Sequence, residues 1–266
     1  MNEFYEIFDE NNLPYLVATK ASNWSSKIEK RSLSCKIFEL DYEDNHIFNS
    51  EKELPLTNYI LHQFELEPFE FFHNQNGSNL NTNVELFYKS LASIQQRSTE
   101  NNRCDEKQVV QMILCLLDSL FPVVCTEQER KLKVGNNYVT SKSDIECIYK
   151  DKINLVIEVK DINNSRNYGN FEMQLFASML CNAQWKYSKG HFNQNGNVNA
   201  YGMIVFGYNV QFYQTEVEVS YMNSINNGFK PNREITLFKY KQLSLLVREE
   251  RKLFIKFLDY FKDGLN

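Results

Sequence analysis

Two carboxylates and an amine stand close together near the middle of the chain, where Asp144 precedes one short apolar segment and Glu158 and Lys160 close the next. A polar turn centred on Asp151 would place Asp144 opposite Glu158. Because side chains alternate between the two faces of a strand, Glu158 and Lys160 would share one face. The spacing therefore predicts that three charged groups meet at one end of a hairpin.

Two carboxylates that face each other on a sheet repel unless a positive charge lies between them. Oxygen ligands with no nearby His or Cys favour Mg²⁺, or Mn²⁺, over zinc. An amine on the same face, such as Lys160, can contact an attacking water or a scissile phosphate and stabilise developing charge. The set predicts metal-dependent hydrolysis of a phosphodiester, with Asp144 and Glu158 as metal ligands. A solvated surface hairpin is the alternative.

The elements that must position these groups are two strands, 145–149 and 153–159, both rich in Ile, Val, Leu and Tyr. Leu155, Ile157 and Val159 would then occupy the face opposite the charged groups. This register depends on an odd-numbered turn, since an even one would move the aspartate to the other face.

The pattern Asp144, strand, Glu158-x-Lys160 resembles the PD-(D/E)XK nuclease superfamily, although no Pro precedes the Asp. The segment 171–180, FEMQLFASML, is similar to the glutamine helix of RecB-type members, which makes Gln174 a candidate to support the site or contact substrate. The resemblance implies a restriction-endonuclease-like α/β (α+β) fold with a central mixed sheet flanked by helices. It also implies a nucleic-acid substrate, with DNA favoured over RNA.

Upstream, apolar residues recur at helical spacing over 105–120 and predict an amphipathic helix. Glu106 lies one turn before Val109 and is expected on the buried stripe, where a carboxylate is costly unless it is paired or bound to metal. In many superfamily members a Glu from this helix adds a metal ligand. First-turn acids also favour helices for electrostatic reasons alone, and Glu127 and Glu129 compete for the role.

Two further elements are expected downstream. The segment 199–219 predicts a second hairpin, broken at 207–209, and its shape resembles the end of the nuclease-like C-terminal domains of Crinkler-type effectors. The segment 239–262 predicts a final helix that buries an apolar stripe.

Charge is unevenly distributed along the chain. Residues 1–100 carry 8 Lys and Arg against 16 Asp and Glu, whereas 101–266 carry 21 against 18. Basic residues gather around the proposed site and are candidates for phosphate contact: Lys131, Lys133, Lys142 and Arg166. An alternative is that these side chains only keep a sheet edge soluble.

The sequence thus predicts an acidic accessory region over 1–100, mixed or mostly helical and able to contact a protein partner, followed by a nuclease-like domain over 101–266. No apolar run is long enough to span a bilayer, and the first residues lack the features of a signal peptide. Scattered cysteines favour a reducing compartment, cytosolic or nuclear, the nucleus of a host cell if the chain is an effector. The alternative function is an inactive nuclease-fold module that binds DNA or a protein.

Overall fold

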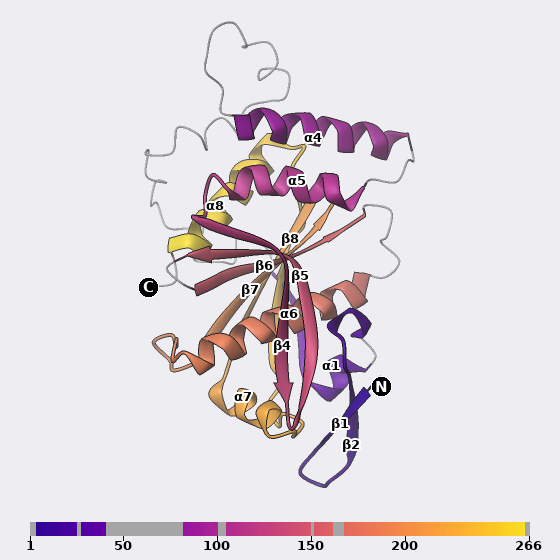
Figure 1. The fold of residues 1–266 in the computed structure, drawn as a ribbon, viewed down its shortest axis with the longest axis vertical. Helices are drawn as coiled ribbons and strands as arrows, with labels where there is room; N and C mark the ends of the chain where they lie inside the picture. Colours follow the sequence, from indigo (N-terminus) through magenta and orange to yellow (C-terminus); the bar gives the residue numbers. More distant parts are fainter. Residues whose placement is uncertain are drawn as a thin grey trace, which may run out of the picture.

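The computed structural model describes residues 4–25, 28–40, 82–100, 105–149, 152–161 and 168–263. Its main element is an eight-stranded mixed sheet in which β3, β9, β8, β7, β6, β5 and β4 follow one another and β10 pairs with β8. Helices cover both faces of the sheet (Figure 1). This architecture confirms the predicted α+β class with a central mixed sheet.

The strands are β1 Phe4–Phe8, β2 Pro14–Ala18, β3 Cys35–Leu40, β4 Val123–Val134, β5 Asn137–Tyr149, β6 Lys152–Lys160, β7 Val198–Phe206, β8 Asn209–Val217, β9 Ile235–Tyr240 and β10 Leu243–Ser244. The helices are the 3₁₀ turn η1 Ala21–Asn23, α1 Glu29–Ser32, α4 Thr82–Thr99, α5 Glu106–Leu117, α6 Tyr168–Ser188, α7 Val219–Asn226 and α8 Arg248–Asp263. In the sheet, β6 runs parallel to β7 and β3 parallel to β9, and the other pairs are antiparallel.

Two hydrophobic cores lie on opposite faces of the sheet. Helices α4, α5 and α8 cover one core, and α6 covers the other together with α7, η1 and the β1–β2 hairpin. On β6, Leu155, Ile157 and Val159 all face the first core, as the alternation predicts. The site residues of β6 therefore face α6.

Close packing of α6 on the sheet depends on Gly202 of β7. A Cβ atom there would lie 2.7 Å from Met179 Sδ and 2.9 Å from Leu175 Cδ2. These distances leave no room for a side chain, so the absence of one lets α6 approach the strand closely.

The N-terminal elements share the cores of the rest of the chain. Strand β3 pairs with β9 in the main sheet, and α4 packs in the same core as α5 and α8. Within the described residues, position 100 is therefore not a boundary between separate hydrophobic cores.

The hairpin predicted over 199–219 is present as β7 and β8, joined by a two-residue turn with Gly207 at φ +58°. The final helix was predicted too early, because 235–240 forms β9, which pairs with β3 and β8, and α8 begins only at Arg248. The β-branched and aromatic residues of this segment find partners on both sides, which outweighs the helical spacing. The predicted apolar stripe of α8 is buried from Phe254 to Phe261.

Candidate active site

The β5–β6 hairpin has the register that the sequence predicts at its open end. Ile145 pairs with Ile157, so the next positions outward are Asp144 and Glu158. The turn itself differs, because Tyr149 pairs with Lys152 across a two-residue connection, and the register shifts between residues 147 and 148. The shift in pairing from the even turn and the shift from the irregularity cancel. Asp144 and Glu158 therefore have the predicted register.

Three charged side chains meet at this end of the hairpin. The ammonium Nζ of Lys160 lies 3.1 Å from Glu158 Oε2 and 3.7 Å from Asp144 Oδ2. The Asp144 carboxylate also accepts a hydrogen bond from the main-chain N–H of Val159 at 2.6 Å. This contact fixes Asp144 against the strand that carries the other two groups. The predicted convergence is thus present.

Burial governs the electrostatics of the site. Glu158 is 4% exposed, and its burial, together with the nearby Asp144 charge, raises its pKa from 4.5 to about 7 although Lys160 opposes the rise. Burial disfavours the charged form of Lys160, but the carboxylates of Glu158 and Asp144 outweigh it and raise the pKa of the amine. The structure therefore holds a cation firmly against a carboxyl that is poised between its two protonation states near neutral pH.

Two buried serines, which the sequence analysis did not identify, support the glutamate. Ser178 of α6 donates to Glu158 Oε1 at 3.3 Å, and its hydroxyl lies 2.8 Å from that of Ser141 on β5. The only signal in the sequence was a serine in an otherwise apolar stretch of helix, one turn after Gln174. Whether this serine contacts Glu158 depends on where α6 packs on the sheet.

Gln174 makes a different contact. Its side-chain amide donates to the main-chain carbonyl of Ser22 at 2.9 Å, which ties α6 to η1. The contact of Gln174 with a substrate stays a prediction.

Glu106 was predicted to be buried, and that prediction is wrong. Asp105 caps the helix by accepting from Lys107 N, which leaves Glu106 in the exposed first turn of α5. Its carboxylate accepts from the main-chain N–H of Asp161 at 3.3 Å, directly after Lys160. Glu106 therefore lies beside the strand end that carries the site, on the solvent side.

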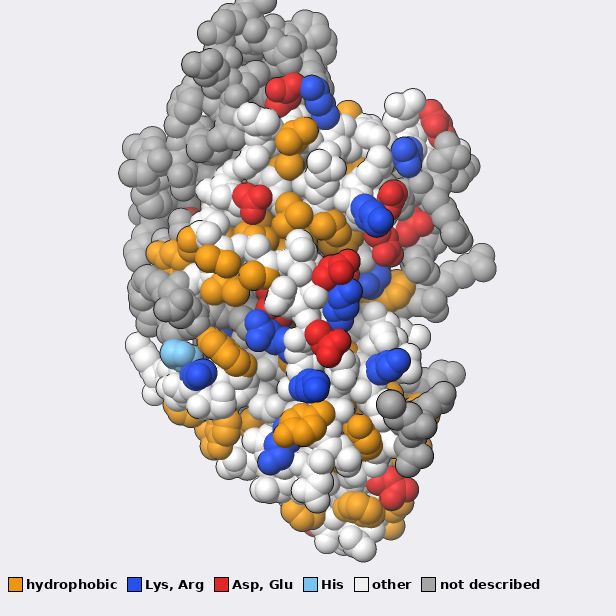
Figure 2. Space-filling model, viewed as in Figure 1, with side chains coloured by type: hydrophobic (Ala, Val, Ile, Leu, Met, Phe, Trp, Pro, Cys, Tyr) orange, Lys and Arg blue, Asp and Glu red, His pale blue; other side chains and the backbone are white. Residues whose placement is uncertain are grey.

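The competing acids are placed elsewhere. Glu127 is exposed and pairs with Lys142 at 3.0 Å, and Glu129 lines a cavity between β4 and α6. Lys131 and Lys133 are exposed on β4, whereas Arg166 lies outside the described residues. Figure 2 shows Lys and Arg side chains interspersed with acidic ones along this face of the molecule. On this face, acidic side chains thus interrupt the basic ones.

A second ion pair lies in the same layer as the site. Arg130 of β4 donates from Nε and Nη2 to the Glu146 carboxylate, at 2.9 and 2.7 Å, and Ser143 donates to the same carboxylate at 3.0 Å. Glu146 is buried, and two planar groups held by several hydrogen bonds form a rigid unit. This pair was not predicted, because its partners lie 16 residues apart on neighbouring strands.

The donor chemistry of the site suits a hard divalent cation. Asp144 and Glu158 provide carboxylate oxygens that already face a positive charge, the Lys160 ammonium. In the part of the chain that the structure describes, no three His, Cys, Asp or Glu side chains are close enough together to hold a metal ion. A metal would therefore rest on this carboxylate pair and on water or substrate oxygens.

No protein-family model matches the chain, and no curated protein matches it significantly. Among the helices of the described residues, none is both long and apolar enough to cross a membrane.

Proposed function

We propose that the chain is a metal-dependent nuclease that hydrolyses phosphodiester bonds in nucleic acid, with DNA favoured over RNA. The observation that carries the proposal is the placement of the Lys160 ammonium between the carboxylates of Asp144 and Glu158 at one strand end. This combination of groups suits binding of a divalent cation together with stabilisation of phosphate charge. The PD-(D/E)XK pattern of the same residues adds support.

In this proposal Asp144 and Glu158 hold Mg²⁺ or Mn²⁺, which would lower the pKa of a bound water and neutralise phosphate charge. Lys160 orients the water and stabilises negative charge on the phosphate oxygens. Ser178 and the Val159 N–H fix the two carboxylates, so that little rearrangement is needed when substrate binds. Glu106 lies close enough to the strand end to bind a water of the metal shell.

The experiment is cleavage by the purified chain of single-stranded DNA, double-stranded DNA and RNA, with Mg²⁺, with Mn²⁺ and with a chelator. Asp144→Asn, Glu158→Gln and Lys160→Ala should each abolish cleavage, and Glu106→Gln should reduce it. The exposed acid of α8, Glu249, which pairs with Lys252, provides a matched control as Glu249→Gln. A folded wild type that cleaves no substrate with either metal would overturn the proposal.

A second candidate is a nuclease-fold module that binds nucleic acid or a protein without turnover. The observation that favours it is that the Lys160 ammonium already contacts both carboxylates, so each has a positive partner without a metal. This candidate predicts binding of nucleic acid that neither Mg²⁺ nor Glu158→Gln alters, with no cleavage.

A further inference from the structure

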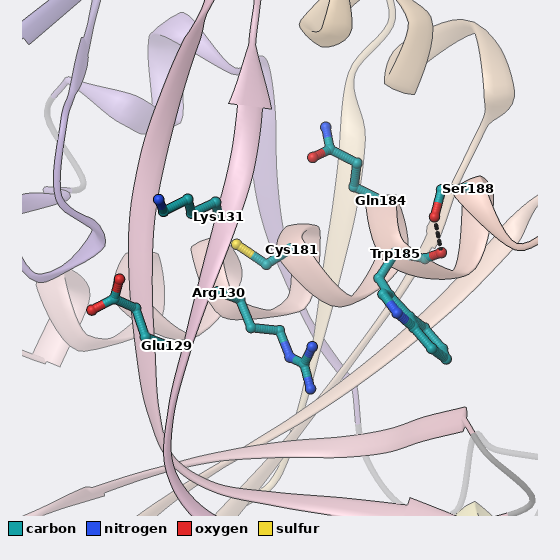
Figure 3. Close-up of a pocket in the computed structure, with 7 residues that line it drawn as sticks. All are labelled: Glu129, Arg130, Lys131, Cys181, Gln184, Trp185 and Ser188. Carbon is teal, nitrogen blue, oxygen red and sulfur yellow. Dashed lines mark hydrogen bonds between the residues drawn. The ribbon is translucent and has the colours of Figure 1, made fainter.

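A cavity of about 380 Å³ lies between the edge strand β4 and helix α6 (Figure 3). It is lined by Glu129, Arg130, Lys131, Cys181, Gln184, Trp185 and Ser188. Its volume falls within the range of about 300–1,000 Å³ that is common for small-ligand sites. It mixes an aromatic ring, a guanidinium, an amide and a strand edge.

The strand edge next to the cavity presents main-chain groups for hydrogen bonding. The side-chain amide of Gln184 accepts from Lys133 N at 2.7 Å and donates to Lys133 O at 3.1 Å, so it pairs with β4 as another strand would. In an antiparallel pair, main-chain groups of alternate residues point away from the partner strand. The N–H and C=O of Lys131, two residues earlier, therefore also point away from β5. Across the described part of the chain, neither has a hydrogen-bond partner.

Two flat side chains flank this edge. The guanidinium of Arg130 is held in one plane by Glu146 and its side chain is 28% exposed. Trp185 is partly exposed and extends from α6 to the same side as Arg130, whereas Lys131 extends away (Figure 3). Indole and guanidinium faces are the surfaces on which nucleic-acid bases stack.

The cavity lies on the same face of the sheet as the candidate active site. Cys181 lines it, and Ser178, which donates to Glu158, lies one turn earlier on the same helix. Trp185 is farther from Ser178, at about 10 Å along the helix axis. A nucleotide stacked on Trp185 would therefore share a face of the sheet with Asp144, Glu158 and Lys160.

We propose that this cavity binds one unpaired base of a single-stranded nucleic acid, on the same face of the sheet as the bond that is cleaved. The proposal rests on the nuclease function proposed above and specifies its substrate. The base stacks on Trp185 or Arg130, and its edge pairs with the N–H and C=O of Lys131. A base in a duplex has its edge already paired and enclosed in the stack, so single strands are preferred. An added peptide strand fits less well, because Gln184 occupies the next edge position at Lys133.

The test uses tryptophan emission of the full chain in a chelator, which separates binding from cleavage. The chain has two tryptophans, and Trp24 is buried and donates to the carbonyl of Ala18. A change in emission on binding therefore reports Trp185. A short single-stranded DNA oligonucleotide should quench the emission at a concentration at least about tenfold lower than its blunt duplex does. The variant Trp185→Phe should remove the response.

Two variants then test the contacts, with affinity measured by the anisotropy of a labelled oligonucleotide. Trp185→Ala should weaken single-strand binding at least about fivefold. Lys131→Pro should weaken single-strand binding more than Lys131→Ala does. Both variants lose the charge of the lysine, and only the proline variant also loses the main-chain N–H. Since that N–H points away from β5, proline should be tolerated on this edge, and circular dichroism checks the fold.

Equal affinity for single strand and duplex, or wild-type affinity in both Trp185→Ala and Lys131→Pro, would overturn the inference. Cleavage assayed separately distinguishes the two proposals. A wild type that cleaves nucleic acid while Trp185 gives no response would overturn this inference alone. A wild type that never cleaves but whose Trp185 emission responds to single strands would overturn the proposed function alone.

Discussion

Replacement of Glu158 by Gln should change how the stability of the protein depends on pH. The pKa of this carboxyl is raised to about 7 in the folded protein, against the usual 4.5. Between these two pH values the folded state therefore holds a proton that the unfolded state has already lost. Stability then falls as the pH rises through this range and levels off above about 7. Glu158→Gln mimics the protonated carboxyl at every pH and lacks this loss.

The magnitude follows from the difference between the two pKa values. At about 1.4 kcal/mol for each pH unit, the rise corresponds to about 3 kcal/mol. Below about pH 4 both proteins carry a neutral group at this position, so the difference between their free energies of unfolding does not depend on pH there. By pH 8 the wild type should have lost about 3 kcal/mol relative to the variant.

The assay is urea unfolding of wild type and Glu158→Gln at several pH values from 4 to 8, in a chelator. All other titrating groups are present in both proteins, so the difference between the two curves reports Glu158 together with its coupling to Asp144 and Lys160. Addition of millimolar Mg²⁺ at pH 8 should restore part of the stability of the wild type, because a ligand of the ionised form stabilises the folded state, and should leave the variant unchanged. A difference between wild type and variant that stays constant within about 1 kcal/mol from pH 4 to pH 8 would show that Glu158 does not titrate with a raised pKa in the folded protein.

Three further predictions concern single residues. Asp144→Asn should reduce cleavage at least about a hundredfold, since loss of groups around metal ligands alone costs about 10–100-fold. Its urea midpoint should hardly change, because the amide oxygen can still accept from the Val159 N–H. Strong cleavage by this variant would exclude Asp144 as a ligand. Lys160→Ala should lower the free energy of unfolding by about 3 kcal/mol at pH 8, because the substitution leaves the carboxylates of Asp144 and Glu158 without their cation. The same urea assay measures this loss. An unchanged midpoint would contradict the burial of the two carboxylates. Gly202→Ala should destabilise the fold by about 1–3 kcal/mol through the clash with Met179. A melting temperature equal to that of wild type would show that α6 can move away.

Local alternation predicted the site, because along β6 Leu155, Ile157 and Val159 face one core while Val156 faces the other. The positions of Glu158 and Lys160 follow directly from that alternation. The position of Asp144 was predicted through the register, and the register holds although the turn is even. The irregularity in strand pairing between residues 147 and 148 compensates for the even turn. No residue type at these positions indicates it in the sequence.

One error is local, and the others come from contacts between segments far apart in the chain. Glu106 was placed on the buried stripe of a helix that begins at that residue, so its side chain lies in the open first turn. The last helix was predicted to begin at 239, which included the end of β9 and all of β10, because the spacing of 239–262 gives no sign that β3 and β8 offer partners. The contact of Ser178 with Glu158 depends on the packing of α6 against Gly202, which no local pattern encodes.

The most direct test of the central claim is cleavage of end-labelled single-stranded DNA by the wild-type chain in Mg²⁺, beside Glu158→Gln and the matched control Glu249→Gln. Wild type and Glu249→Gln should cleave the DNA, Glu158→Gln should not, and none of the three should cleave it in a chelator. Cleavage by Glu158→Gln at the rate of wild type, or no cleavage by folded wild type with either Mg²⁺ or Mn²⁺, would contradict the claim.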